Sequence, residues 1–286
     1  MRLIFGRLFK IQLRTVLVLT LSTGFAVLLP DYLWADNADP GATGQVMPLK
    51  KLEVLGIKGD DNRVRVDISA YPWRMVGRLN HSGNHCTAVL VGPSAILTAA
   101  HCFWDKRRNR WSVPSAYHFV LGYDKGDIVA HSKIKSFTVA GGASTIKMQL
   151  RPELENDWAI AHLEKPLGKL YGFVKLTKIN PRNLGNFIAT GSTVVQGGYS
   201  RDIAHVLTVD TNCKVNRIQS SKSGALLVHQ CDATKGDSGS PLFLQTGKDF
   251  TLLGIHVATL PHSSGKSDGI ALSVDMFRAG VSATQK

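Results

Sequence analysis

The sequence predicts an all-β protein of the barrel or sandwich class. Its central and carboxyl-terminal parts contain short runs rich in Val, Ile, Leu and Thr, separated by Gly, Pro, Asn and Asp. Few segments repeat apolar residues at helical spacing; the clearest is the tail, residues 275–283, which predicts a short C-terminal helix. Many short strands in one region favour a closed or packed antiparallel architecture. The predicted strands are residues 64–69, 86–91, 117–121, 192–196, 225–229, 241–244 and 250–257.

The amino terminus has the composition of a secretory signal. Four basic residues among the first 14 are followed by an apolar run over residues 15–29, and then by Pro30 and the small residue Ala35. This order is typical of a signal peptide, here residues 1–35. The run is shorter than the ~20 residues that span a bilayer as a helix, and no second run of that length follows. The alternative is an uncleaved anchor, because Leu33 is a poor residue two places before the cut.

We therefore expect a secreted or periplasmic protein that makes no stable membrane insertion after signal cleavage. Residues 36–60 are polar, contain Pro and Gly, and show no periodicity, which predicts a propeptide or linker. The remaining residues, 61–286, hold all the predicted strands. With 286 residues and 44% hydrophobic content the chain can bury a core, and we expect it to be a monomer.

The chain is basic, with a formal net charge of +13. Residues 1–35 contribute four positive charges and one negative charge, so 13 − 3 leaves +10 on the exported part. Such a charge raises the question of nucleic-acid or anionic-membrane binding. The basic residues are dispersed, apart from the cluster at 105–110, which is typical of a solvated loop. We therefore expect no nucleic-acid partner.

The sequence holds four cysteines: Cys86, Cys102, Cys213 and Cys231. In an exported protein an even number favours disulfides, and four cysteines allow about three connectivities. Zinc is the competing interpretation, but the sequence has no C-x-x-C or H-E-x-x-H spacing, and no calcium-loop motif. We expect disulfides, and neither a metal nor an organic cofactor.

Three segments carry candidate catalytic residues. They place His101 in AILTAAHC, Asp157 in ENDWAIAHL and Ser238 in GDSGSPL. Each segment alone has an ordinary structural explanation as a strand end or a glycine-rich turn. Together they follow the order His, Asp, Ser, which is the order of the chymotrypsin-type triad and differs from the subtilisin and α/β-hydrolase orders.

On these motifs, the chain from Asp61 onward resembles a trypsin-like serine endopeptidase. Further stretches, at 59–66, 71–80 and 86–102, look closer to bacterial secreted members related to the glutamyl endopeptidases. The resemblance implies two six-stranded antiparallel β-barrels of the chymotrypsin type with the substrate cleft between them. His101 and Asp157 would come from the first barrel and Ser238 from the second. It also implies the disulfide Cys86–Cys102, and with it Cys213–Cys231.

The resemblance further implies protein or peptide substrates and an acyl-enzyme mechanism. A neutral serine hydroxyl is a poor nucleophile, so Ser238 needs a base, and His101 can take its proton near neutral pH. Asp157 would hold the imidazole in the required tautomer. The backbone N–H groups of Gly236 and Ser238 would bind the oxyanion. The alternative function is a catalytically inactive protease-fold module that binds anionic surfaces.

Two candidate substrate-binding residues point to opposite specificities. Asp232 lies six residues before Ser238, where trypsin-like enzymes that cut after Arg or Lys carry their pocket aspartate. His256, in the segment GIH, matches the pocket histidine of the glutamyl endopeptidases, and Lys235 would also attract an acidic side chain. Cys231 directly precedes Asp232, which departs from trypsin and leaves a structural role open for this aspartate.

Activation of a precursor is a further hypothesis. Asp237 stands where trypsin-like proenzymes use an aspartate to capture a newly formed α-amino group, whereas the glutamyl relatives often carry asparagine. A cut near Val54 would release an apolar amino terminus, with Glu53 or the pair Lys50-Lys51 directing it.

Overall fold

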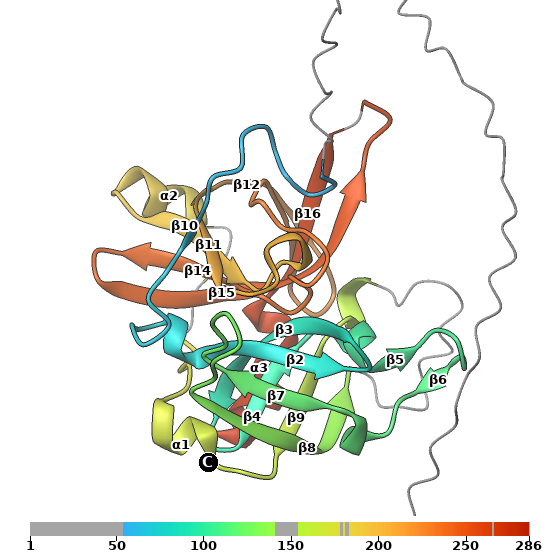
Figure 1. Ribbon diagram of the computed structural model, residues 1–286. Helices are drawn as coiled ribbons and strands as arrows, with labels where there is room; N and C mark the ends of the chain where they lie inside the picture. Colours follow the sequence, from blue (N-terminus) through green and yellow to red (C-terminus); the bar gives the residue numbers. More distant parts are fainter. Residues whose placement is uncertain (1–53, 141–153, 178–179, 181–182, 265, 286) are drawn as a thin grey trace, which may run out of the picture. The chain divides into compact units, whose positions relative to one another are not determined.

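The first half of the folded chain is a closed six-stranded antiparallel barrel. The computed structural model describes residues 54–140, 154–177, 180, 183–264 and 266–285. The predicted signal and most of the predicted linker lie outside these residues. The barrel closes in the order β2-β3-β4-β9-β8-β7 and forms the lower half of Figure 1. Its strands are β2 (Val76–His81), β3 (Asn84–Gly92), β4 (Ala95–Thr98), β7 (His118–Leu121), β8 (Ala130–Val139) and β9 (Ala159–Leu163).

The sequence of each barrel strand fits its position. In β3 the last six residues are all buried, and β4 is buried throughout, so both strands consist of nearly continuous apolar runs. The first half of β8 instead alternates between buried and exposed positions, with basic residues on the outside. The sequence does not predict this strand, because the exposed Lys133, Lys135 and Ser136 dilute its apolar pattern. A short hairpin of β5 (Trp104–Asp105) and β6 (Arg110–Trp111) extends from the barrel.

The predicted all-β fold is confirmed, and its second half is a large antiparallel sheet of eight strands, where the resemblance implied six. The strand order is β1-β11-β10-β14-β15-β16-β13-β12. The edge strand β12 and the strand β11, which lies next to the opposite edge, are adjacent in sequence, since β11 ends at Cys213 and β12 begins at Val215. The extra strand β1 comes from the N-terminal segment and pairs with β11. The strands are β1 (Arg63–Arg65), β10 (Thr193–Gly198), β11 (Thr208–Cys213), β12 (Val215–Ser220), β13 (Ala225–His229), β14 (Pro241–Thr246), β15 (Asp249–Pro261) and β16 (Ser267–Ser273).

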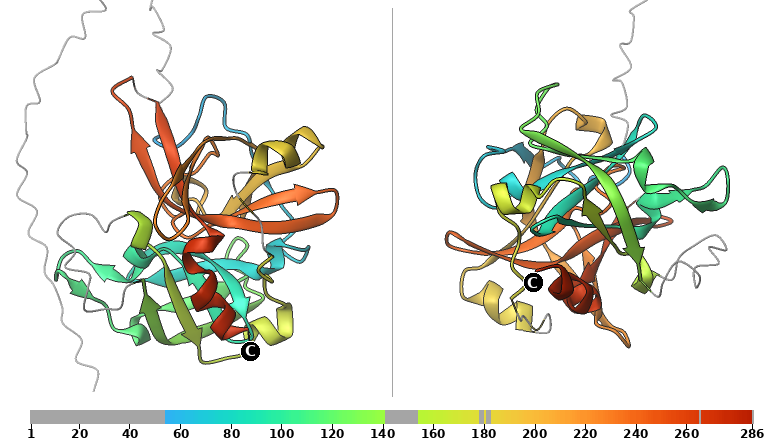
Figure 2. Two further views of the ribbon diagram at one scale, coloured as in Figure 1. Left: turned by 180° about the vertical axis from the view of Figure 1, so that it is seen from behind. Right: turned by 90° about the horizontal axis from the view of Figure 1, so that it is seen from below.

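The two halves exchange their terminal segments. The N-terminal segment pairs with the second sheet through β1 before the chain enters the first barrel. The C-terminal helix α3 (Val274–Thr284) follows β16 but packs on the first barrel as well, as Figure 2 shows. Gln285, just after α3, donates hydrogen bonds to the carbonyl oxygens of Val91 and Val174 at 2.8 and 2.9 Å. Two short helices, α1 (Leu167–Tyr171) and α2 (Leu184–Ala189), lie in the sequence between the halves.

Most of the predicted elements are present. The C-terminal helix and the strand over residues 225–229 are confirmed, and five other predicted strands overlap observed ones. The prediction for residues 64–69 is wrong beyond Arg65, where β1 ends. The carboxylate of Asp67 accepts hydrogen bonds from the backbone N–H of Ser69 at 2.8 Å and from its hydroxyl at 2.7 Å, which turns the chain. No helix in the described residues is long and apolar enough to cross a membrane.

Candidate active site

The first barrel presents His101 and Asp157 side by side. His101 lies in a short 3-10 helix, Ala100–Phe103, that directly follows β4, and Asp157 lies just before β9, the neighbour of β4. The carboxylate of Asp157 accepts the backbone N–H of His101 at 2.8 Å, and its other oxygen lies 2.7 Å from His101 Nδ1. Asp157 is 3% exposed. Both of its oxygens therefore hold the histidine, one through the backbone and one through the ring.

These contacts determine the state of the His101 ring. A carboxylate can only accept a hydrogen bond, so Nδ1 carries the proton and Nε2 is free to accept one. Burial by itself lowers the pKa of His101, but the charge and hydrogen bond of Asp157 outweigh it and raise the pKa above its ordinary value. Asp157 thus stabilises the imidazolium that His101 becomes when it takes up a second proton.

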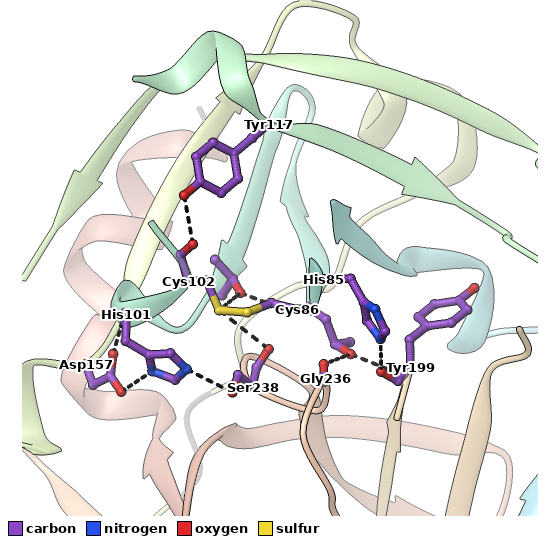
Figure 3. Close-up of a disulfide and its surroundings, with 11 residues drawn as sticks. His85, Cys86, His101, Cys102, Tyr117, Asp157, Tyr199, Gly236 and Ser238 are labelled. Atoms are coloured by element: carbon purple, nitrogen blue, oxygen red, sulfur yellow. Dashed lines mark hydrogen bonds and ion pairs between the residues drawn. A yellow bond between two sulfur atoms is a disulfide. The ribbon is translucent and has the colours of Figure 1, made fainter. Parts of the chain in front are cut away.

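Ser238 reaches His101 from the second sheet. Its Oγ lies 2.9 Å from His101 Nε2, so Figure 3 shows the three predicted side chains in one row. Ser238 belongs to the loop between β13 and β14, and it is partly exposed. The hydroxyl donates to the nitrogen that Asp157 leaves unprotonated. The structure therefore brings together all three residues predicted from separate segments.

Thr87 on β3 holds the Ser238 loop against the first barrel, and sequence reasoning missed it. Its backbone N–H donates to the carbonyl oxygen of Ser238, and its hydroxyl donates to that of Gly236, both at 2.9 Å. The same hydroxyl oxygen accepts the backbone N–H of Tyr199 at 2.9 Å. Thr87 is fully buried. The available signal was a hydroxyl residue at the start of an apolar run, next to a cysteine.

Two glycines of the loop are required by geometry. Gly236 has φ +100°, and a Cβ there would lie 2.4 Å from the carbonyl oxygen of Tyr199. Gly239 has φ +85°, and a Cβ there would lie 2.2 Å from the hydroxyl oxygen of Thr98. Both positions combine a backbone conformation that favours glycine with a close approach to the neighbouring chain. Within the described residues, neither Gly236 nor Ser238 uses its backbone N–H in a hydrogen bond to a protein acceptor.

Both predicted disulfides are present. Cys86–Cys102 links β3 to the 3-10 helix that carries His101, as Figure 3 shows. Cys213–Cys231 links the end of β11 to the segment before Asp232. The sulfurs of Cys86 and Cys102 lie near His101, but as disulfide sulfurs they carry no thiolate for a metal ion.

A cavity of about 520 Å³ adjoins Ser238. Of the two predicted specificity residues, His256 lines it and Asp232 does not. His256 is linked to the Ser238 loop by its backbone: its carbonyl oxygen accepts the N–H of Gly239 at 2.7 Å, and its N–H donates to Ser240 O at 2.9 Å. The lining residues are Val54, Leu55, Arg201, Asp202, Thr234, Lys235, Ser238, His256, Val257, Ala258 and Thr259.

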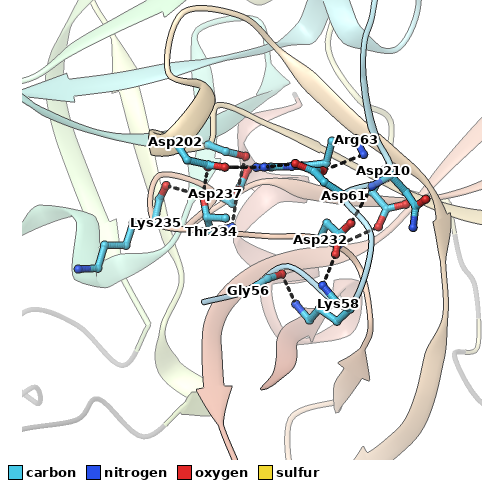
Figure 4. Close-up of polar contacts among 12 residues, drawn as sticks. Gly56, Lys58, Asp61, Arg63, Asp202, Asp210, Asp232, Thr234, Lys235 and Asp237 are labelled. Atoms are coloured by element: carbon cyan, nitrogen blue, oxygen red, sulfur yellow. Dashed lines mark hydrogen bonds and ion pairs between the residues drawn. The ribbon is translucent and has the colours of Figure 1, made fainter. Parts of the chain in front are cut away.

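Asp232 holds the N-terminal segment to the second sheet. One carboxylate oxygen accepts the backbone N–H of Lys58 at 2.6 Å and the other accepts that of Asn62 at 3.1 Å. The ammonium of Lys58 donates to the carbonyl oxygen of Gly56 at 2.7 Å, as Figure 4 shows, and to that of Cys231 at 2.8 Å. Asp232 is 4% exposed. Both carboxylate oxygens of Asp232 are therefore bonded within the chain. These contacts fit a structural role for Asp232, which the sequence left open.

Asp237 is buried next to Ser238 without a cationic partner among the described residues. Its Oδ2 accepts the hydroxyl of Ser200 at 2.6 Å and the backbone N–H of Thr234 at 2.8 Å. Burial raises the pKa of Asp237 to about 6, although these hydrogen bonds oppose the shift. Arg63 lies nearby but forms its ion pairs with Asp61 and Asp202, at 2.7 and 2.5 Å.

The family described as Trypsin matches residues 62–281, which is most of the chain.

The chain belongs to the trypsin family.

The resemblance inferred from the three motifs is thereby confirmed. Among curated trypsin-family relatives, a glutamyl endopeptidase of Bacillus licheniformis is 23% identical over 233 residues, covering 78% of this chain and 67% of the relative. The solved structure of a Glu endopeptidase in complex with MPD is 21% identical with a TM-score of 0.63, and covers 80% of this chain and 100% of its own. A thermostable serine protease from an extremophilic microorganism is 17% identical with a TM-score of 0.52, covering 74% of this chain and 97% of its own. At these identities the structures support the shared fold alone.

Proposed function

We propose that the protein is an exported serine endopeptidase that hydrolyses peptide bonds through an acyl-enzyme. The hydrogen bond of 2.9 Å between Ser238 Oγ and His101 Nε2, with Asp157 on the other ring nitrogen, carries this proposal. His101 takes the hydroxyl proton as Ser238 attacks the carbonyl carbon, and then gives it to the leaving amine. Water repeats the sequence on the ester, with His101 again as base, and releases the acid product and free Ser238.

The oxyanion of each tetrahedral intermediate is assigned to the backbone N–H groups of Gly236 and Ser238. Neither group has a protein acceptor among the described residues, which leaves both for the substrate. A donor of this kind contributes about 3–4 kcal/mol to the stabilisation of the transition state. The two carbonyl bonds from Thr87 fix the peptide planes of this loop, so the donors are held before substrate arrives.

We further propose that the enzyme cuts after acidic residues. His256 lines the cavity beside Ser238, while both oxygens of Asp232 are occupied by backbone N–H groups of the N-terminal segment. Lys235 and Arg201 add positive charge to the cavity lining, and the carboxylate of the lining residue Asp202 is paired with Arg63. A carboxylate entering this cavity meets a hydrogen-bond donor and two cations, whereas a substrate ammonium finds no free acid at position 232.

Labelling with a serine-directed fluorophosphonate tests the mechanism, with Ser238→Ala as the matched control. We expect the mature protein to be labelled and the variant to be unlabelled. Absence of labelling in the mature protein, or full peptidase activity in Ser238→Ala, would favour the alternative of an inactive binding module.

A panel of fluorogenic peptides with Arg, Lys, Glu, Asp or Phe before the scissile bond tests the specificity. We expect cleavage after Glu, its loss in His256→Ala, and its retention in Asp232→Ala wherever that variant folds. Cleavage after Arg that depends on Asp232 would overturn the assignment to His256.

Maturation is part of the same proposal. We keep residues 1–35 as the signal and place the end of any removed segment before Gly56. Gly56 accepts the backbone N–H of Ala233 at 3.0 Å, and Lys58 is bonded to Asp232, so both belong to the folded domain. Amino-terminal sequencing of the active enzyme is expected to find a terminus at Gly56 or upstream of it; a terminus at Ile57 or later would contradict this placement.

A further inference from the structure

A second buried histidine lies behind His256. His229, the last residue of β13, places its Nε2 at 3.0 Å from His256 Nδ1, and both residues are at most 2% exposed. The imidazole of His229 fits because its cross-strand partner on β16 is Gly269. A Cβ at Gly269 would lie 2.2 Å from the ring of His229. The site is therefore shaped around a histidine pair that the catalytic mechanism does not use.

The hydrogen bonds of this pair can run in only one direction. The backbone N–H of Cys231 points at His229 Nδ1 at 3.2 Å, and a backbone N–H can only donate. His229 Nδ1 therefore accepts, which places the single proton of its neutral ring on Nε2. That N–H donates to His256 Nδ1, so the proton of His256 must be on its own Nε2.

The contacts of His256 Nε2, at the other end of this row of hydrogen bonds, agree with this direction. Thr259 Oγ1 lies 3.2 Å from the carbonyl oxygen of Ala233, to which it donates, and 3.4 Å from His256 Nε2, from which it accepts. A bond of 3.4 Å is long, so the N–H of His256 is incompletely satisfied by the protein. Thr259 and His256 both line the cavity beside Ser238.

We propose that His229 is a specificity-determining positioning residue: it fixes the tautomer of His256 so that an N–H donor, and not a lone pair, faces the side chain of an acidic substrate. This inference rests on the proposed cleavage after acidic residues and explains that preference by the tautomer of His256. A carboxylate accepts hydrogen bonds and cannot donate them, so the opposite tautomer of His256 would repel it.

Electrostatics favour the neutral form that this arrangement requires. Burial, together with the charges of Lys58 and His101, lowers the pKa of His256 to about 3. Burial and the neighbouring His256 and Lys58 lower the pKa of His229 well below its ordinary value. Both rings are thus neutral near pH 7, and tautomer choice, not charge, decides what His256 offers to the substrate.

The first experiment observes the tautomer directly. Two-dimensional ¹H–¹⁵N spectra of the histidine rings are recorded on the mature protein carrying Ser238→Ala, with and without His229→Leu. We expect the Nε2–H tautomer of His256 in the parent and a shift toward Nδ1–H in His229→Leu. An Nδ1–H tautomer in the parent, or an unchanged Nε2–H tautomer in His229→Leu, would overturn the proposal.

The second experiment compares cleavage after Glu with cleavage after Gln. Gln has the same shape as Glu but carries both a donor and an acceptor, so it tolerates either tautomer. In His229→Leu we expect the ratio of kcat/KM for Glu over Gln to fall about tenfold, mainly through the KM for Glu. General damage to the fold would lower kcat/KM for the Glu and Gln substrates equally and leave their ratio unchanged. An unchanged ratio overturns the proposal.

His229→Gln is the matched rescue variant. Its amide oxygen can accept the N–H of Cys231 while its amide nitrogen donates to His256, so we expect the Glu preference to return to within a few-fold of wild type. Equal loss of the preference in His229→Leu and His229→Gln would overturn the proposal. If wild type shows no preference for Glu, the proposed specificity fails, while the spectra still decide whether His229 sets the tautomer.

Discussion

The two halves of the molecule hold their functional groups in different ways. In the first barrel, hydrogen bonds close the six strands, and the bonds of Asp157 to His101 stay within that barrel. In the second sheet, the segment that leads to Ser238 is held by the N-terminal segment, through Asp232 and Lys58. Closure of a barrel satisfies every strand edge, whereas an open sheet leaves edges that other segments must cover.

This difference separates the proposed base from the groups proposed to select the substrate. The proposed base and its orienting acid lie on an apolar barrel, and the cavity proposed to select the substrate lies among ionisable groups. Disturbing the first half should therefore remove turnover, while disturbing the second half outside the Ser238 loop should change stability, pH dependence and substrate preference.

The largest effect is expected at His101. Replacement by Ala removes the base for Ser238 and should lower kcat about a million-fold, as when one member of a comparable triad is removed. His118→Ala is the matched control, because His118 is exposed on β7 of the same barrel. Peptidase assays on both variants decide the point. A loss in His101→Ala of less than a hundredfold would contradict the assigned role.

The two disulfides offer a direct comparison of the halves. They close loops of similar size, with sequence separations of 16 and 18, so replacing either pair by Ala should cost a similar amount, about 3 kcal/mol in the free energy of unfolding. Loss of Cys86–Cys102 should mainly lower kcat, since it supports the helix of His101. Loss of Cys213–Cys231 should mainly raise KM, because the backbone N–H of Cys231 donates to His229, which contacts the cavity residue His256.

Urea unfolding in a Ser238→Ala background measures the change in the free energy of unfolding without self-digestion. Steady-state kinetics in the active background measure the changes in kcat and KM. The same change of kcat and KM in both disulfide variants would contradict the expected difference between the two halves.

Asp237 should give the second sheet a distinct pH dependence. Its pKa is about 6 in the folded protein, above the ordinary 3.8 of an aspartate, so the folded state binds the proton more tightly. This carboxyl group therefore stabilises the fold at low pH, and its contribution falls as the pH rises from about 4 to about 6, by about 3 kcal/mol in all. Asp237→Asn cannot ionise and should lack this fall.

The measurement is the difference in urea midpoint between Asp237→Asn and its parent, at steps from pH 4 to pH 8 in the Ser238→Ala background. Other titrating groups, including His256 with its lowered pKa, are common to both proteins and cancel in the difference. Parallel pH curves for the two proteins would exclude the proposed shift.

The smallest effect is expected at Asp232. Asp232→Asn keeps one acceptor oxygen but places an amide against the N–H of Lys58 or Asn62, which should destabilise the protein by about 1–3 kcal/mol. Asp249→Asn, at an exposed position of β15, is the matched control and should change little. Thermal unfolding compares the two. A stable Asp232→Asn variant with altered cleavage after Arg would instead place Asp232 in the substrate pocket.

Some contacts were predictable from sequence because they are local or belong to a known motif. The three motifs around His101, Asp157 and Ser238 came from short segments, and the structure places their side chains in hydrogen-bond contact. Thr87 was not predictable, because its role arises from two carbonyl groups about 150 residues away. The strand pairing of the second half was not predictable for the same reason, since β1 joins the sheet only through long-range pairing with β11.

By itself, the sequence determined the fold class, the order of the motif residues and the positions of most strands, since alternation of apolar residues and glycine-flanked turns are local properties. The proposed choice between Asp232 and His256 rests only on the tertiary structure. Both are polar residues close to Ser238 in sequence or across strands, and the local sequence around them points to opposite specificities. What separates them is which partners occupy their polar atoms: backbone N–H groups for Asp232, and a second histidine for His256. Such occupancy depends on contacts between distant segments, which form only when the chain has folded.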